Sequence, residues 1–204
     1  MNQYFKIFPV DPDGNCFFYS VSYCLYNTIQ KYNEIKEAVY TELRTFNTEY
    51  EPFFDPDESE FSNFTDYIES TLEDGTWADN LIIKSAVESY RLTITIFHIS
   101  FLKHREKYFE SDNASRFTIV NTNKLSDDNI NIYLLYDGVH YTPLIHINKS
   151  EIETEIESSL FALDKFMKFK LFQYNQIQDS KRRDQVIFEI KNYIDDHNIS
   201  LKYM

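Results

Sequence analysis

A cysteine and a histidine in this sequence, Cys16 and His140, could together carry out nucleophilic catalysis. Cys16 follows the turn Asp13-Gly14-Asn15 and opens a segment whose apolar residues recur at helical spacing. A helix N-terminus presents free backbone N–H groups and the positive end of the helix dipole. We therefore expect the Cys16 thiol to have a depressed pKa and the surrounding N–H groups to stabilise an oxyanion.

A cysteine nucleophile also needs a general base, and histidine suits that role near neutral pH. His140 stands just after the turn Asp137-Gly138, where the tip of a hairpin can reach a neighbouring loop. The other four histidines fall in predicted strands (His98, His146) or among charged residues (His104, His197). We predict that His140 is the base and that the others are structural or solvated.

The second cysteine, Cys24, lies eight residues after Cys16 on the same predicted helix. That spacing separates them by about two turns, roughly 12 Å, which is too far for a disulfide. We interpret Cys24 as a small buried apolar residue. The cysteines and histidines form no C-x-x-C or H-x-x-x-H pair, so we expect neither a metal site nor another cofactor.

Helical patterns dominate the first half of the chain. After the helix that begins at Cys16, the spacing of apolar residues predicts a helix over about 31–46 and a short acidic helix over about 61–72, with a loop at 47–60 between them. Thr76 and Asp79 match a capping box, which predicts that the next helix begins there and runs to about Tyr90.

Strands follow. Alternating apolar residues predict a strand beginning at Leu92, a further strand at 117–120 and a hairpin around Asp137-Gly138. Ser150 and Glu153 form another capping box, which opens a helical C-terminal segment. We expect an α+β domain over residues 1–148 and a helical extension over 149–204 that packs on it.

The charge is strongly acidic and unevenly distributed. The formal net charge is −13, which argues against nucleic acid as a partner. Residues 51–74 hold nine acidic residues and no Lys or Arg, so a basic protein or peptide is the natural complement. No secretory signal or membrane-spanning run is readable, and we expect a cytoplasmic protein without a membrane partner, or one exported by a route that leaves no readable signal.

Three motifs, in order, resemble those of the ovarian tumour (OTU) family of cysteine-type deubiquitinases. Asp13-Gly14-Asn15-Cys16-Phe17-Phe18 resembles the motif around the family's nucleophile. Thr76-Trp77-Ala78-Asp79 is similar to its central tryptophan segment, and Tyr136-Asp137-Gly138-Val139-His140-Tyr141 resembles its histidine motif. The resemblance covers about residues 1–147 and implies a small mixed β-sheet sandwiched between helices.

The resemblance also implies an activity: hydrolysis of the isopeptide bond after the C-terminal glycine of ubiquitin, in polyubiquitin chains, or of a ubiquitin-like modifier. Cys16 is then the nucleophile and His140 the base, with backbone N–H groups of residues 13–16 forming the oxyanion hole. By the same resemblance, substrate-binding positions are Gly14, Asn15, Trp77, Val139 and Tyr141. Trp77 has an alternative interpretation as a core aromatic, and the acidic stretch 51–74 one as a solvated surface.

The group that orients His140 is open. Many family members have Asp or Asn two residues after the histidine, where this sequence has Thr142. Asp11 and Asp13 are alternatives, and we favour Asp11 because Asp13 can brace the turn before Cys16. A Cys-His dyad without a third member is the remaining interpretation.

Two other functions compete with this one. The first is a catalytically weak or inactive OTU-fold module that binds ubiquitin. The second is another Cys-His hydrolase, such as a papain-like peptidase or amidase. An AT-rich codon bias suggested by the composition, together with the compact size, favours a viral or intracellular-bacterial protein that acts on host ubiquitin signalling in the host cytosol.

Overall fold

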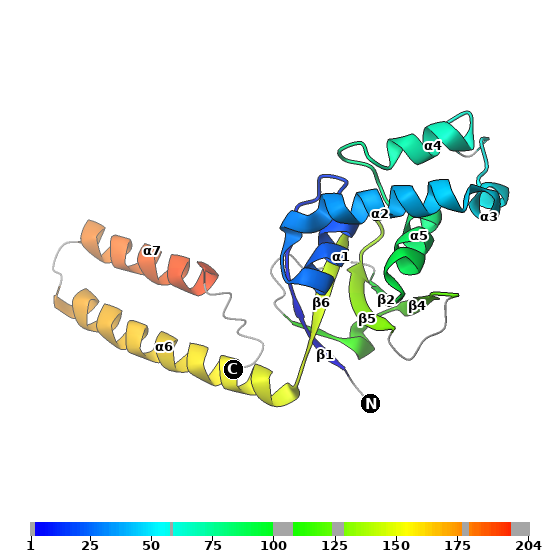
Figure 1. Ribbon diagram of the computed structural model, residues 1–204. Coiled ribbons are helices and arrows are strands. Elements are labelled where there is room, and N and C mark those ends of the chain that lie inside the picture. Colours follow the sequence, from blue (N-terminus) through cyan, green and yellow to red (C-terminus); the bar gives the residue numbers. More distant parts are fainter. Residues whose placement is uncertain (1–2, 58, 100–107, 124–128, 177–179, 197–204) are drawn as a thin grey trace. The chain divides into compact units, whose positions relative to one another are not determined.

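The computed structural model describes residues 3–57, 59–99, 108–123, 129–176 and 180–196, which divide into two units at His146 and Ile147 (Figure 1). The helices of the first unit are α1 (Cys16–Tyr26), α2 (Tyr32–Thr45), α3 (Asn47–Tyr50), α4 (Phe64–Ser70) and α5 (Asn80–Tyr90). Its strands are β1 (Tyr4–Ile7), β2 (Leu92–His98), β3 (Tyr108–Glu110), β4 (Arg116–Asn121), β5 (Ile130–Tyr136) and β6 (Tyr141–Ile147).

The strands of the first unit form one mixed sheet of six strands in the order β3-β1-β6-β5-β2-β4. β2 and β5 run parallel, whereas β6 pairs antiparallel with β5 and β4 pairs antiparallel with β2. The predicted α+β class and mixed sheet are confirmed. The parallel pair matters for the candidate site, because both β2 and β5 end next to the loop that carries His140.

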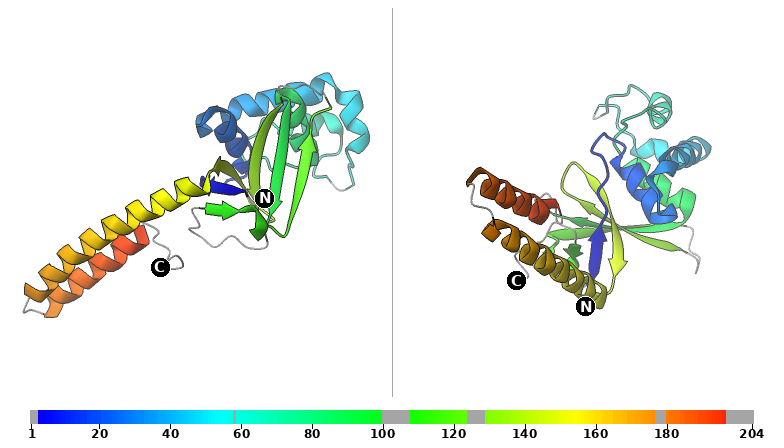
Figure 2. Two further views of the ribbon diagram at one scale, coloured as in Figure 1. Left: turned by 90° about the horizontal axis from the view of Figure 1, so that it is seen from below. Right: turned by 90° about the vertical axis from the view of Figure 1, so that its left-hand side faces the viewer.

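The two faces of the sheet serve different apolar clusters. Successive side chains of a strand point to opposite faces. Ile94, Ile96 and Leu134 therefore join the main core beneath the helices, while Phe97 and Leu135 join a smaller cluster on the other face. Figures 1 and 2 show α1, α2, α4 and α5 gathered on one side of the sheet.

The helix that carries Cys16 is anchored by the two aromatic residues that follow it. Phe17 and Phe18 are fully buried, and Val21 continues the same face one turn later. Burying such side chains contributes roughly 1.5–3 kcal/mol each. The start of α1 is thus held by its own sequence in one position against the sheet.

Both predicted capping boxes are wrong in register. Asp79 caps α5 by accepting hydrogen bonds from the N–H groups of Leu81 and Ile82, but the Thr76 hydroxyl instead donates to the Ser70 and Glu73 carbonyl groups. The later helix begins at Lys149, before Ser150. In this helix the capping pair is Asn148 and Glu151, two residues earlier than the predicted Ser150 and Glu153. The Asn148 N–H donates to the Glu151 carboxylate at 3.4 Å.

Two loops differ from expectation. The predicted loop 47–60 contains α3 and a 3₁₀ turn at Glu51–Phe53. The hairpin connection spans residues 137–140, and only Gly138 in it has a positive φ, 104°. A four-residue connection tolerates ordinary φ at Asp137, so its side chain is free to brace the loop.

The second unit is a helical hairpin of α6 (Lys149–Gln176) and α7 (Ser180–Asp196). Among the side chains that the structure describes in this unit, the apolar residues Leu163 and Val186 are buried, and the rings of Phe166 and Tyr193 stack at 3.9 Å. The predicted packing of residues 149–204 on the first unit stays a prediction. Among the residues described, no helix is long and apolar enough to cross a membrane.

Candidate active site

Cys16 is the first residue of α1, and its side chain is buried, with 7% of the residue exposed. Its sulfur accepts a hydrogen bond from the backbone N–H of Tyr141 at 3.4 Å. The structure thereby brings the residue next to His140 onto the thiol, across 125 positions of sequence. No hydrogen bond joins the Cys16 sulfur and the His140 ring, both of which the structure describes.

A serine that the sequence analysis missed ties the two segments together. Ser20 is fully buried one turn after Cys16, and its hydroxyl donates to the carbonyl groups of Cys16 at 2.7 Å and of Tyr141 at 3.2 Å. Tyr141 is therefore held through both its N–H and its C=O group. A serine four residues after the cysteine, on the same helix face, was the available signal.

The loop that carries His140 is braced by Asp137. The Asp137 carboxylate accepts from the N–H groups of Val139 at 3.2 Å and of His140 at 2.9 Å. The Tyr136 hydroxyl closes the loop by donating to the Gly138 carbonyl. These contacts hold the backbone of the loop at His140. They do not involve the His140 ring.

The His140 ring has one nitrogen, Nδ1, that is buried and makes no hydrogen bond, the one such side-chain atom among the described residues. Thus none of the three predicted orienting residues bonds to it. Asp13 instead accepts from the Asn15 N–H and the Tyr19 hydroxyl, Asp11 is exposed, and Thr142 is buried in β6. The role of Asp13 as a brace fits these contacts, and the orienting group stays a prediction.

The predicted depression of the thiol pKa is not what the structure shows. Burial raises the pKa of Cys16, and the nearby Asp13 carboxylate adds to the rise. The N–H groups of Tyr141 and Phe17 lower the pKa but do not compensate for burial. The helix N-terminus is visible in the sequence, whereas desolvation depends on the folded surroundings of the thiol.

We accordingly expect alkylation of Cys16 by iodoacetamide to accelerate as pH rises from about 6 to about 9, because only the thiolate reacts and a raised pKa keeps it scarce at neutral pH. The rate is measured by mass spectrometry of the Cys16 peptide. A rate that is already constant from about pH 6 upward would instead show a thiolate stabilised by an imidazolium.

All three glycines of the chain mark the loops of this site. Gly14, Gly75 and Gly138 have φ values of 90°, 79° and 104°. A Cβ on Gly14 would lie 2.2 Å from the Gly75 carbonyl oxygen, so the backbones of these two loops are in direct contact at the two glycines. The scarcity of glycine was a signal for Gly75 that the sequence analysis did not use.

Asn15 fastens the same two loops. It is 1% exposed, its amide donates to the Asp74 carboxylate at 2.8 Å, and its side-chain oxygen accepts from the Gly75 N–H at 3.1 Å. Its side chain thus faces the Asp74-Gly75 loop, and any contact of Asn15 with a substrate stays a prediction. Asp74 is a residue of this site that the sequence analysis missed.

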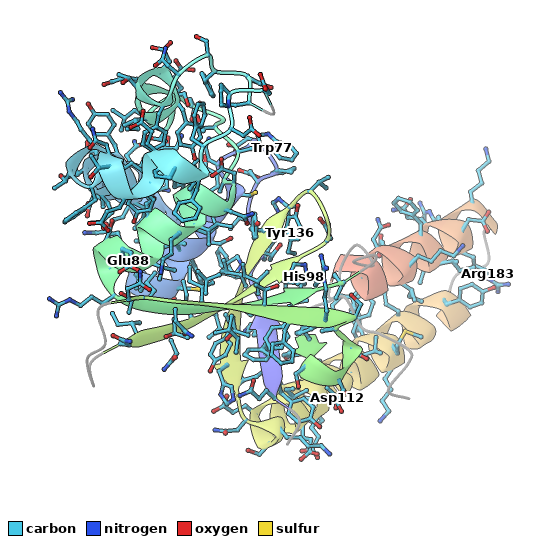
Figure 3. All side chains as sticks on the ribbon, turned by 90° about the vertical axis from the view of Figure 1, so that its right-hand side faces the viewer. Trp77, Glu88, His98, Asp112, Tyr136 and Arg183 are labelled. Carbon is cyan, nitrogen blue, oxygen red and sulfur yellow. The ribbon has the colours of Figure 1, made fainter. Side chains whose placement is uncertain are left out.

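The remaining predicted substrate-binding residues differ in exposure. Trp77 and Val139 are 65% and 61% exposed, which excludes the interpretation of Trp77 as a core aromatic. Figure 3 shows Trp77 projecting from its loop on the helix side of the sheet. Tyr141 is half-buried and packs on Phe17 and Tyr136, with ring centroids 5.5 and 4.5 Å away.

The other cysteine and the other histidines lie apart from this arrangement. Cys24 is half-buried with a pKa raised to about 12 by burial, and the structure has it as a free thiol. His98 bonds to Thr118 and His146 is exposed beside Phe5, while His104 and His197 are outside the described residues. Within the described ranges, no cluster of three metal-ligating side chains occurs.

A buried thiol at a helix start, N–H groups directed at it and a histidine loop beside it define a candidate thiol hydrolase on an α+β fold. The model of the family described as OTU-like cysteine protease matches residues 11–142, and the chain belongs to this family. That membership decides against the papain-like alternative.

Two curated relatives come from Arabidopsis thaliana. OVARIAN TUMOR DOMAIN-containing deubiquitinating enzyme 10 is 24% identical over 148 residues, which cover 72% of this chain and 36% of that protein. OVARIAN TUMOR DOMAIN-containing deubiquitinating enzyme 7 is 31% identical over 91 residues, covering 45% and 23%. The chain therefore matches about a third or less of each relative's length.

Solved structures share the fold at low identity. The OTUD1 OTU domain superposes with a TM-score of 0.55 at 17% identity, covering 68% of this chain and 84% of that one. The Hazara virus OTU bound to ubiquitin gives a TM-score of 0.52 at 19% identity, covering 72% and 84%. These likenesses establish the fold.

Proposed function

We propose that this chain is a cysteine isopeptidase, a deubiquitinase that cleaves after the C-terminal glycine of ubiquitin or a ubiquitin-like modifier. The observation that carries the proposal is the Tyr141 N–H bonded to the Cys16 sulfur, because it sets the His140 loop against the thiol. The family match and the relatives described as deubiquitinating enzymes support the substrate class. We further propose that it acts in the cytosol.

The reaction follows from the proposed roles. His140 takes the proton of the Cys16 thiol, and the thiolate attacks the carbonyl carbon of the scissile bond. Backbone N–H groups of residues 13–16 stabilise the oxyanion. The amine then leaves with the proton from His140, and a water molecule hydrolyses the thioester to release the modifier.

A panel of di-ubiquitin substrates of each linkage tests this proposal and also gives the linkage preference. We expect cleavage of at least one linkage, with recovery of free ubiquitin. If no linkage is cleaved, fusions to ubiquitin-like modifiers form the second panel, and failure of both would contradict the proposed activity. The viral OTU among the structural neighbours suggests host proteins as targets, which remains part of the proposal.

A ubiquitin-binding module without turnover is the second candidate. The observations that favour it are the missing hydrogen bond between the Cys16 sulfur and the His140 ring and the unpartnered Nδ1. Catalytic hydrogen bonds of free enzymes often form only with substrate bound. A chain that binds ubiquitin but leaves every linkage intact would establish this candidate.

The third catalytic residue is tested by a pair of conservative variants. If Asp11 orients His140, Asp11→Asn lowers kcat/KM by at least about tenfold, which corresponds to about 1.4 kcal/mol. Thr142→Val then has little effect. The reverse result assigns the role to Thr142, and two variants with unchanged kcat/KM leave a Cys-His dyad.

A further inference from the structure

Lys36 of α2 is the one buried Lys or Arg in the part of the chain that the structure describes, with 2% of its surface exposed. Its ammonium donates to the Glu73 carbonyl at 2.5 Å and lies 5.0 Å from the centre of the Phe18 ring. Glu73 directly precedes Asp74, and Phe18 is the second residue after Cys16. Lys36 therefore contacts both the nucleophile helix and the loop that covers its start.

Two carboxylates act on this buried ammonium. Asp13 and Asp74 lie on the two loops that touch at Gly14 and Gly75. Burial lowers the pKa of Lys36, while the charges of Asp74 and Asp13 raise it. The two carboxylates thus compensate in part for the desolvation of the ammonium.

The backbone of the contact bears on the chemistry. The loop of residues 13–16 carries the N–H groups proposed to bind the oxyanion, and the Gly75 segment rests directly on it. The N–H donors of an oxyanion hole stabilise the transition state because they point at the oxyanion, and loss of one donor lowers kcat by about 10²–10³-fold. A segment that holds this loop can therefore control turnover without touching the substrate.

Building on the proposed isopeptidase activity, we propose that Lys36 and Asp74 are positioning residues for the oxyanion loop. Lys36 holds the carbonyl of Glu73, and Asp74 holds the side chain of Asn15. Together they keep the segment 73–75 seated on residues 13–16. Neither residue is assigned a contact with the reacting atoms.

Asp74 gives the safer variant, because it is exposed and its replacement leaves the core intact. Asp74→Ala removes the acceptor for Asn15, and we expect kcat on a cleaved ubiquitin substrate to fall at least about tenfold, with KM within about threefold. Asp74→Asn keeps a side-chain oxygen as acceptor and should restore kcat to within about twofold of the wild type. Loss of kcat in both variants, or in neither, would overturn the role of Asp74.

Lys36→Met tests the buried cation, and Lys84→Met is its matched control. The Lys84 ammonium also donates to a carbonyl, that of Asn121 at 2.8 Å, and pairs with Glu88 at 2.6 Å. Figure 3 shows Glu88 at the end of the sheet away from Tyr136 and Trp77. Both substitutions remove an ammonium that is bound to a backbone carbonyl group.

The two variants are compared by turnover and by alkylation of Cys16, which forms no oxyanion. Lys36→Met should lower kcat at least about tenfold and change the iodoacetamide rate by no more than about twofold, whereas Lys84→Met lowers neither. Equal losses of turnover and alkylation, or no loss of turnover, would refute positioning by Lys36.

Hydrogen exchange separates this inference from the proposed activity. Amides of residues 13–16 should exchange at least about tenfold faster in Lys36→Met than in Lys84→Met, whether or not the wild type hydrolyses ubiquitin conjugates. An inactive wild type that shows this difference would contradict the proposed function but support the positioning role of Lys36. An active wild type without the difference would contradict the positioning role alone.

Discussion

Cys16→Ala and Cys16→Ser are expected to lower kcat/KM for hydrolysis of ubiquitin conjugates by at least about 10³-fold. The fold and ubiquitin binding should remain. Both exchanges remove the thiolate and little volume from a site that the aromatic residues after it hold in place. Turnover is measured on the di-ubiquitin linkage cleaved best, and folding by thermal unfolding.

Cys24→Ala is the matched control for these variants. Cys24 lies on the same helix and is also a free thiol, but its weak contact is to the Tyr133 carbonyl at 3.9 Å. We expect unchanged kcat/KM for this variant. Residual turnover in Cys16→Ser near the wild-type rate would show that another group is the nucleophile.

His140→Ala has the second largest expected effect, a loss of about 10²–10⁴-fold in kcat/KM at neutral pH. Because burial raises the pKa of the Cys16 thiol, we expect the reaction to need a base that removes its proton. Part of the lost rate should return as pH rises, since hydroxide then ionises the thiol.

His146→Ala provides the comparison for this variant, because His146 lies on β6, the strand that follows His140, is exposed, and contacts Phe5 of the smaller apolar cluster. It should retain near wild-type kcat/KM. If His140→Ala has the same rate as the wild type across the pH range, a different residue serves as the base.

The parts of the fold that sequence predicted are those set by neighbouring residues. The helix after Cys16 and the strands around Asp137-Gly138 were predicted because apolar spacing and turn residues act over a few positions. Thr76 and Ser150 were misassigned because a capping pattern recurs in several registers, and tertiary contacts select one. Such contacts sent the Thr76 hydroxyl to Ser70 and Glu73.

The parts of the site that sequence reasoning missed depend on contacts between distant segments. Asn15 meets Asp74 across 59 positions, and Lys36 meets Glu73 across 37. The prediction that the pKa of Cys16 is lowered was wrong for the same reason, because desolvation depends on the folded surroundings and not on the helix start. The scarcity of glycine was the local signal in the sequence for the contact between the loops at Gly14 and Gly75.

Cys16 is proposed as the nucleophile that reacts with the C-terminus of ubiquitin. Ubiquitin bearing a thiol-reactive group in place of its terminal carboxylate should form a covalent adduct, with the modification mapped by mass spectrometry to Cys16. The adduct should be absent in Cys16→Ala and present in Cys24→Ala. Tight binding of the probe without an adduct, or an adduct at Cys24, would contradict the central claim.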